Sequence, residues 1–109
     1  MGLTKTEIFT EAQNELAVLL KALAHPARIA ILQQIINAKA CICGDLSTEL
    51  GLAQPTISQH LKELKNAGLI QGTIEGVSVC YCINPVKWAE LKEQLTSFLD
   101  SAGPAGNYC

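Results

Sequence analysis

The sequence predicts a mainly α-helical domain with a small β-wing, and three observations lead to this fold class. Two short helical patterns flank a glycine turn within residues 45–68. Two strand patterns, residues 69–75 and 77–83, follow directly and meet at Gly76. Further helical patterns lie on both sides of this unit. A helix-turn-helix that is followed by a hairpin predicts a winged helix, with the element order α-α-β-α-α-β-β-α.

The helix-turn-helix is predicted from its breaking residues and its apolar spacing. The first helix covers residues 45–50, and Gly51 stands where a left-handed C-terminal cap is needed, because glycine has no Cβ atom. Pro55 fits the first turn of the second helix, where its missing N–H group has no partner to lose. Gly68 ends that helix. The buried stripe of the second helix consists of Ile57, Leu61 and Leu64.

Two helices are predicted before this unit. Thr4 and Glu7 form a capping-box pattern, so the first helix is expected to begin near Lys5. His25 and Pro26 end it and start the second helix. The positions expected to face inward are Ile8, Ala12, Leu16, Leu19, Leu20 and Leu23 in the first helix, and Ile29, Leu32, Ile35 and Ile36 in the second.

An extended segment and a last helix complete the domain. Residues 40–42 are expected to be extended, and Asn84 with Pro85 gives a strong helix start, since Asn caps and Pro takes the first helical position. Residues 1–102 are therefore predicted to form one domain, and residues 103–109 a flexible tail. The apolar stripe of the last helix consists of Trp88, Leu91, Leu95, Phe98 and Leu99.

The first and last predicted helices carry more apolar surface than a small core can cover. Apolar residues make up 49% of the 109 residues, which is generous for this size. We therefore expect these two helices to pack across the two-fold axis of a homodimer. Two recognition helices about one turn of DNA apart would then read a palindrome. The alternative is that both helices only complete the core of the monomer.

Composition limits the location and the partners of the chain. No apolar run reaches the roughly 18 residues of a membrane span, and no signal pattern opens the chain, so we expect a cytoplasmic protein without membrane contact. The formal net charge is −2, which argues against strong non-specific binding to nucleic acid. Affinity depends on local charge, however, and the candidates for a positive surface that reaches DNA are Arg28, Lys39, Lys62 and Lys65.

The polar face of the second helix of the pair predicts contact with double-stranded DNA. Glutamine can pair with adenine through two hydrogen bonds, serine and threonine reach bases or phosphates, and lysine neutralises phosphate. The alternative is a solvated outer face on an ordinary helix hairpin. The residues that lie off the buried stripe are Gln54, Thr56, Ser58, Gln59 and Lys62.

The order of elements also supports a family resemblance. With LKALAHPARIAIL before the helix-turn-helix and AQPTISQHLKELKNAGLI within it, the chain closely resembles the ArsR/SmtB family of bacterial repressors over residues 12–99. The resemblance implies a homodimeric winged-helix repressor that leaves its operator when an inducer binds. Inducers in that family are usually metal or metalloid ions, and some members sense reactive sulfur or oxidants.

The inducer sites of that family are only partly present. The zinc-type site uses Asp and His on the last helix, but residues 85–102 contain no histidine. The arsenic-type site has the pattern Cys-x-Cys-x-x-Cys at the start of the helix-turn-helix. This chain has Cys41 and Cys43, and Leu46 takes the third position.

A second Cys-x-Cys pair suggests how the set is completed. In winged helices the segment before the helix-turn-helix usually pairs with the last wing strand, which would place Cys41 and Cys43 beside residues 79–83. Cys80 and Cys82 leave that strand on one face, because side chains alternate along a strand. Three thiolates suit As(III) or Sb(III), and four suit Zn(II), Cd(II) or another soft divalent ion. Such an ion would be an inducer and not an obligatory cofactor.

Two other interpretations of Cys41, Cys43, Cys80 and Cys82 stay open. Their proximity would also allow a disulfide between the strands, so that the same repressor responds to oxidants or reactive sulfur. Any one of them can instead be a small buried hydrophobe. An enzyme is not expected, because the chain has no Cys-x-x-Cys, no phosphate-binding glycine loop and no acid–base constellation. The main prediction is a repressor that is released by an arsenite-type ion, with the redox switch as the alternative.

Overall fold

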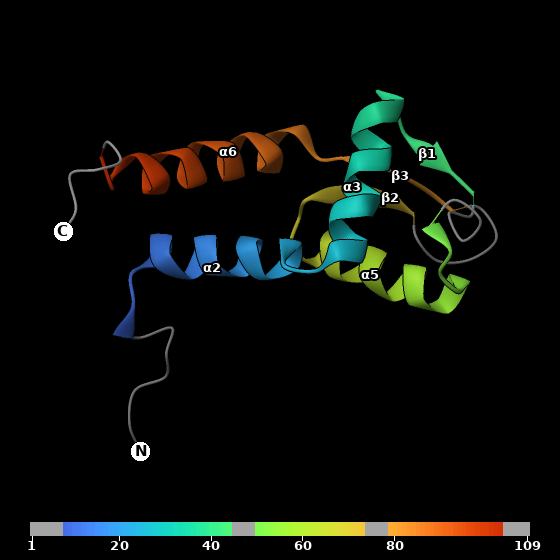
Figure 1. Ribbon diagram of the computed structural model, residues 1–109, viewed down its shortest axis with the longest axis horizontal. Coiled ribbons are helices and arrows are strands. Elements are labelled where there is room, and N and C mark those ends of the chain that lie inside the picture. The colour runs from blue at the N-terminus through green and yellow to red at the C-terminus, as the bar shows by residue number, and fades with distance from the viewer. Residues whose placement is uncertain (1–7, 45–49, 74–78, 104–109) are drawn as a thin grey trace, which may run out of the picture.

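The computed structural model describes residues 8–44, 50–73 and 79–103 (Figure 1). The order of the described elements confirms the predicted fold class, a mainly helical domain with a small sheet. The helices are α2 (Glu11–Leu23), α3 (Pro26–Ala38), α5 (Gln54–Asn66) and α6 (Pro85–Asp100), and the strands are β1 (Ile42–Cys43), β2 (Ile70–Thr73) and β3 (Cys80–Ile83). Of the predicted helix over residues 45–50, only Leu50 is described, and it is helical. The predicted wing tip at Gly76 and the tail beyond residue 103 lie outside the described residues.

Helices α2 and α6 lie side by side and extend away from the end of the molecule that α3, α5 and the sheet form (Figure 1). A single core joins the two parts, because α2 contacts α3, α5 and α6. The buried apolar residues of this core are Leu19, Ala22, Ile31, Leu32, Ile35, Ile57, Leu61, Leu64, Leu69, Ile70, Tyr81 and Leu91. No helix among the described residues is both long and apolar enough to cross a membrane.

The three strands form one antiparallel sheet in the order β1-β3-β2. Ile42 of β1 is paired with Tyr81 of β3, which confirms the expected pairing of the segment before the helix-turn-helix with the last wing strand. Tyr81 is fully buried, so this side of β3 faces the core as predicted. Of the predicted strand residues 69–75 and 77–83, Leu69 and Val79 are not in strands, and residues 74, 75, 77 and 78 lie outside the described residues.

The start of α2 differs from the prediction. The sequence pattern predicted one helix from near Lys5 to Leu23, but α2 begins at Glu11 and the backbone is not helical at Thr10. The Thr10 side chain accepts a hydrogen bond from the Gln13 N–H group (3.1 Å), and the Gln13 side chain accepts one from the Thr10 N–H group (2.9 Å). This second capping box ends any helix that precedes it, because an N-cap residue needs extended backbone angles.

Helix α3 starts where the sequence predicts. Pro26 takes the first turn, and the Nδ1 atom of His25 accepts a hydrogen bond from the Ala27 N–H group (3.0 Å). The predicted inward face is partly wrong, because Ile29 and Ile36 are each 46% exposed. Ile31, which was not predicted to be buried, is fully buried instead. Helix α3 turns the side that carries Ile31, Leu32 and Ile35 toward α5 and β3, and Ile29 and Ile36 lie seven residues apart on another side.

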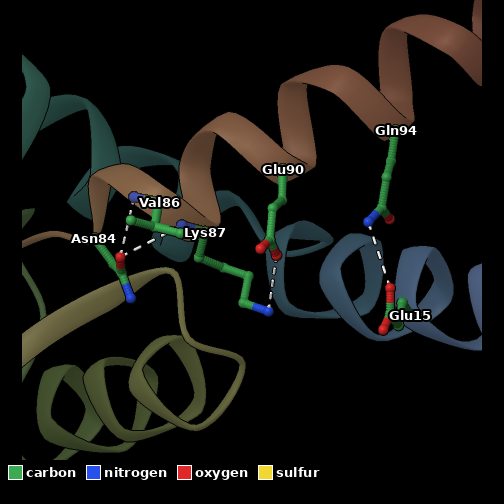
Figure 2. A network of polar contacts seen from close by, with 6 residues as sticks. All are labelled: Glu15, Asn84, Val86, Lys87, Glu90 and Gln94. Carbon is green, nitrogen blue, oxygen red and sulfur yellow. Dashed lines mark hydrogen bonds and ion pairs between the residues drawn. The ribbon is translucent and has the colours of Figure 1, made fainter.

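Helix α6 also starts as predicted, and its polar contacts are shown in Figure 2. The Asn84 side-chain oxygen accepts hydrogen bonds from the N–H groups of Val86 (3.2 Å) and Lys87 (3.4 Å). Lys87 also forms an ion pair with Glu90, which lies one turn farther along α6 (3.1 Å). Farther along, the Gln94 side chain donates to Glu15 of α2 (3.5 Å), which links the two long helices (Figure 2).

Large apolar side chains remain exposed on the same two helices. Val18 of α2 is 57% exposed, and Phe98 and Leu99 of α6 are 59% and 60% exposed. The sequence had assigned Phe98 and Leu99 to the apolar stripe of the last helix. The described residues of the chain therefore do not cover this stripe at its C-terminal end.

The glycine positions of the helix-turn-helix and the wing follow from backbone geometry. Gly51 and Gly68 have positive φ angles of 69° and 85°, as predicted for residues that end helices. Gly72 in β2 has a φ angle of 125° and lies directly against β3. A Cβ atom at this position would overlap the carbonyl oxygen of Cys80 and would lie 2.9 Å from the Cα atom of Tyr81. Only glycine allows this close approach of the two strands.

Candidate functional site

Helix α5 carries all five residues that the sequence predicts to read DNA. Its inner side is buried through Ile57, His60, Leu61 and Leu64. On the outer side, Thr56 and Gln59 are exposed, while Gln54, Ser58 and Lys62 are partly buried. The five residues therefore lie on the part of the helix surface that the core leaves uncovered.

Two hydrogen bonds hold the outer face of α5. The Gln54 side chain donates to the Ser58 hydroxyl (3.3 Å), and the Gln59 side chain donates to Glu63 (3.2 Å). Both pairs are four residues apart, so they link neighbouring turns of the same helix. A base or phosphate that accepts a hydrogen bond from the Gln59 side chain has to replace Glu63 as the acceptor. The negative charge of Glu63 also opposes the approach of a phosphate.

A partly buried cluster joins the inner face of α5 to α2 and α3. The Arg28 Nε group donates to the Nδ1 atom of His60 (3.1 Å), and its Nη1 group donates to the carbonyl oxygen of Ala22 (3.3 Å). The His25 ring lies 4.4 Å from the His60 ring. Burial lowers the pKa of His60, and the nearby His25 and Arg28 lower it further, while Glu63 acts in the opposite direction. The neutral imidazole is the form that accepts the Arg28 hydrogen bond.

The C-terminal end of α5 is joined to the wing. The Lys65 ammonium group donates to the carbonyl oxygen of Gly72 in β2 (2.7 Å). The Leu69 N–H group donates to Leu64 (3.0 Å), and the Asn84 N–H group donates to Leu69 (2.9 Å). A displacement of β2 would therefore act directly on the C-terminal end of α5 through the hydrogen bond between Lys65 and Gly72.

The four cysteines predicted to form one cluster come together on β1 and β3. Cys43 lies directly opposite Cys80, and the register places Cys41 opposite Cys82. Their Cα atoms are 4.0 Å and 4.3 Å apart. Gly44 and Val79 form the next pair of the ladder, and the Gly44 N–H group donates to the Val79 carbonyl oxygen. In an antiparallel ladder, hydrogen-bonded and non-hydrogen-bonded pairs alternate, so the cysteine pairs occupy non-hydrogen-bonded positions, where the Cα atoms lie closer together.

Two disulfides join the strands. Cys41 is bonded to Cys82, and Cys43 is bonded to Cys80. Cys41 and Cys43 are exposed, and Cys80 and Cys82 are partly buried. In this state the sulfurs offer no thiolate, and the part of the chain that is described has no group of three or more His, Cys, Asp or Glu side chains that can hold a metal ion.

Two contacts of the site were not predicted from the sequence. Arg28 had been considered a residue that reaches DNA, but its side chain faces His60. Lys65 had been considered one too, and it binds the backbone of β2. Neither contact leaves a signal in the sequence, because the partners lie 32 and seven residues away on other elements.

Comparisons with known proteins agree on one family. The family described as "Bacterial regulatory protein, arsR family" matches residues 25–71, which include α3 and α5. The biofilm growth-associated repressor of Agrobacterium fabrum is 37% identical over 82 residues, which are 75% of this chain and 69% of that protein. The HTH-type transcriptional regulator NmtR of Mycobacterium tuberculosis is 33% identical over 85 residues, 78% of this chain and 70% of that protein.

A comparison with solved structures finds a similar fold. The structure of HlyU from Vibrio cholerae superposes with a TM-score of 0.63 at 29% sequence identity. The match covers 87% of this chain and 98% of that one. The similarity therefore extends over the long helices and the sheet as well as over the region of the family match.

Proposed function

The chain belongs to the ArsR family of bacterial regulatory proteins, and we propose that it is a homodimeric repressor whose affinity for operator DNA depends on the oxidation state of four cysteines. Its relatives are transcriptional repressors and not enzymes. The observation that carries the proposal is the direct opposition of two cysteine pairs across β1 and β3.

DNA binding is assigned to the outer face of α5. Thr56 and Gln59 are exposed there, and Gln54, Ser58 and Lys62 lie beside them. Ala53, the N-cap residue, has no side-chain hydrogen bond to the helix, so the first N–H groups of α5 can donate to a DNA phosphate. The short polar side chains near this end suit base contacts in the major groove.

The dimer is assigned to α2 and α6. The exposed side chains of Val18, Phe98 and Leu99 form the part of the apolar surface that one protomer leaves open. A two-fold interface that covers it would present two α5 helices to one face of DNA. We expect Phe98→Glu to sediment as a monomer in analytical ultracentrifugation, whereas Thr96→Glu, an exposed control on the same helix, stays dimeric.

The cysteines can act on α5 through the wing. Each disulfide fixes β1 to β3, and β3 is hydrogen-bonded to β2 through its full length. Lys65 then connects β2 to the C-terminal end of α5. If the cross-linked sheet fits the DNA-free position of α5 better, oxidation lowers operator affinity by the difference between the two states. Coupling of this kind typically changes affinity about 5- to 150-fold.

The proposed location strengthens the assignment of a switch. We propose that the repressor acts in the cytoplasm, where thiols are normally kept reduced and disulfides are mostly transient and regulatory. In that compartment, oxidation of the four cysteines would be a reversible signal, and the disulfides would not be permanent structural cross-links.

A second candidate inducer is a soft ion that binds the reduced cysteines. All four side chains leave β1 and β3 on one face of the sheet, since the members of each pair are two residues apart on their strand. Three reduced thiolates suit As(III) or Sb(III), and four suit a soft divalent ion. The ion would act as inducer by changing the spacing of β1 and β3, and this spacing is also what the disulfides fix.

Fluorescence anisotropy with a labelled fragment of the chain's own promoter tests the proposal. We expect the reduced protein to bind and the oxidised protein to bind at least tenfold more weakly, with recovery after reduction. The variant with Ser at positions 41, 43, 80 and 82 should bind in both conditions. Cys109→Ser serves as the control for disulfides between tails.

The outcomes separate the candidates. If As(III) releases the reduced wild type, and oxidant does not, the soft-ion repressor replaces the redox switch. If neither treatment changes the affinity, or if the four-Ser variant responds like the wild type, the cysteines are not the sensor. If no form binds the promoter, the assignment of α5 is wrong for this DNA, and the net charge of −2 is the reason to expect such weak binding.

A further inference from the structure

A pocket of about 320 Å³ opens beside one of the two disulfides. Cys41 and Cys82 form part of its wall, and the Cys43–Cys80 disulfide does not. The volume is on the order of ten water molecules, which is enough for a small organic molecule. The two disulfides therefore differ in what can reach them from this side.

The lining combines three kinds of chemistry. Ile35, Ile36 and Ile83 give an apolar surface, the Cys41–Cys82 bond gives an electrophilic sulfur, and Lys39 gives one amine. No acidic side chain is among the described residues that line the pocket. A ligand that uses all three has an apolar part, a nucleophile for sulfur and a negative charge.

The charge at the mouth of the pocket depends on Lys39. Lys39 is the C-cap residue of α3, and its N–H group donates to Ile36 (3.1 Å). The C-terminal end of a helix carries about half a negative charge, which by itself would repel an anion. The Lys39 ammonium group reverses that sign, so the preference for an anion should depend on this one side chain.

We propose that the pocket admits a small organic thiol that carries a carboxylate, and that this thiol opens the Cys41–Cys82 disulfide. The inference rests on the proposed redox function and adds the chemical class of the reductant.

The reaction is a thiol–disulfide exchange. The thiolate of the ligand, after loss of its proton to water, attacks Sγ of Cys41, which is the more exposed residue of the pair. A new sulfur–sulfur bond forms between the ligand and Cys41, and the Cys41–Cys82 bond breaks. The electron pair leaves on Cys82, which becomes a thiolate and takes a proton from water. A second molecule of the thiol attacks the mixed disulfide, leaves as the small disulfide and frees Cys41.

Two single-disulfide proteins provide matched targets for the experiment. One keeps Cys41–Cys82 and carries Ser at positions 43, 80 and 109; the other keeps Cys43–Cys80 and carries Ser at 41, 82 and 109. Each is treated with 3-mercaptopropionate or with cysteamine, and the freed cysteine is trapped by alkylation and measured by mass spectrometry. The rates are divided by the rates of the same thiols with a small soluble disulfide, which removes their different intrinsic reactivity.

Lys39 and the C-terminal end of α3 together carry a net charge of about +0.5, and the two thiols differ by two unit charges, so the difference equals about one unit-charge interaction at contact distance in water. We therefore expect the corrected rate at Cys41–Cys82 to favour mercaptopropionate about fivefold. Cys43–Cys80 should show no such preference. Lys39→Gln should remove the preference for mercaptopropionate or reverse it, because only the negative end of α3 then remains, and Lys39→Arg should keep it. High salt should weaken it as well, since the site is open to solvent.

Equal rates for the two thiols at Cys41–Cys82, or a preference that survives Lys39→Gln, would overturn the inference. Its failure is distinct from failure of the proposed function. If dithiothreitol restores operator binding and the pocket shows no preference, the switch stands without this ligand class. If the preference is present and reduction leaves operator affinity unchanged, the pocket assignment stands and the proposed switch does not.

Discussion

Removal of the disulfides should reduce stability in a non-additive way, because one disulfide lies inside the loop of the other. Cys41–Cys82 spans 41 positions of the chain, and Cys43–Cys80 spans 37 positions within it. The perturbation is a set of three variants in the Cys109→Ser background. They carry Ser at 41 and 82, Ser at 43 and 80, or Ser at all four positions.

The magnitude follows from the entropy that a cross-link removes from the unfolded chain. A single link that closes a loop of about 40 residues stabilises the fold by about 4 kcal/mol at 25 °C. Once either link is present, the second closes only a further loop of about six residues, which contributes about 2 kcal/mol. Each double variant should therefore lose about 2 kcal/mol, and the four-Ser variant about 6 kcal/mol. The two double variants together thus account for only about two thirds of the full loss.

Urea unfolding followed by circular dichroism measures these differences. All proteins are compared at one protomer concentration, because association also contributes to the stability of a dimer. Mass spectrometry after alkylation verifies which cysteines are bonded in each sample. Under reducing conditions the proteins should differ by less than about 1 kcal/mol, since the substituted side chains are exposed or only partly buried.

Two results would contradict this reasoning. If each double variant loses about 4 kcal/mol and the four-Ser variant about 8 kcal/mol, the two links act independently and are not nested in the unfolded chain. If the four-Ser variant is as stable as the oxidised parent, the links do not constrain the chain at all, and the disulfide state is not the stable oxidised form.

Three further predictions concern the wing, the buried histidine and the DNA surface. Gly72→Ala should lower the free energy of unfolding by at least about 2 kcal/mol in urea, since its Cβ atom meets the backbone of β3. Gly44→Ala, a control with a positive φ angle of 102° and no atom within 4 Å of the new Cβ, should lose less; equal losses would refute the overlap. Because the pKa of His60 is lowered in the folded protein, the unfolded state binds more protons, and stability should fall as the pH drops through about 6.5 toward the folded pKa. His60→Asn keeps an acceptor without titrating, so thermal unfolding between pH 7.5 and 5 should lose this slope; an unchanged slope would assign it to other groups. Finally, Gln59→Ala should weaken operator binding by about 1–3 kcal/mol in a sequence-dependent way, whereas Lys62→Gln should weaken all DNA alike and reduce the salt slope by about one. Anisotropy at several salt concentrations separates the two, and wild-type binding by both variants would remove α5 from the interface.

Local signals in the sequence were enough for most helix starts and for the order of the elements. Asn84 with Pro85, and His25 with Pro26, start helices in the structure as predicted, because capping and proline geometry act within four residues. At the N-terminal side, the predicted start near Lys5 lies outside the described residues, and only the predicted continuity of the helix through Thr10 is wrong. Thr4 and Glu7 match a capping box, but the box observed among the described residues uses Thr10 and Gln13.

The buried faces were harder to predict where a helix is apolar on several sides. Ile29, Ile31, Ile35 and Ile36 are all isoleucines on one helix, and apolar spacing alone does not rank them. The structure buries Ile31 and Ile35 because α5 and β3 pack on that side of α3. Packing partners from distant parts of the chain decide such cases.

The cysteine cluster shows where local pattern ends and tertiary structure begins. Alternation along a strand, which depends on backbone geometry alone, placed Cys80 and Cys82 on one face, opposite Tyr81. The general pairing of strands in a winged helix placed them beside Cys41 and Cys43. The sequence by itself therefore determined that these four residues are neighbours, and it determined the family and the outer face of α5.

Only the tertiary structure decided which cysteine is bonded to which, and what surrounds each bond. The register of β1 against β3 sets the partners, and a shift of one residue would turn the side chains to the other face. The same holds for Arg28 with His60 and for Lys65 with Gly72, which meet across different elements. Contacts of this kind depend on how whole elements are positioned, and the free energy that positions them is spread over the buried core and not over the few residues that touch.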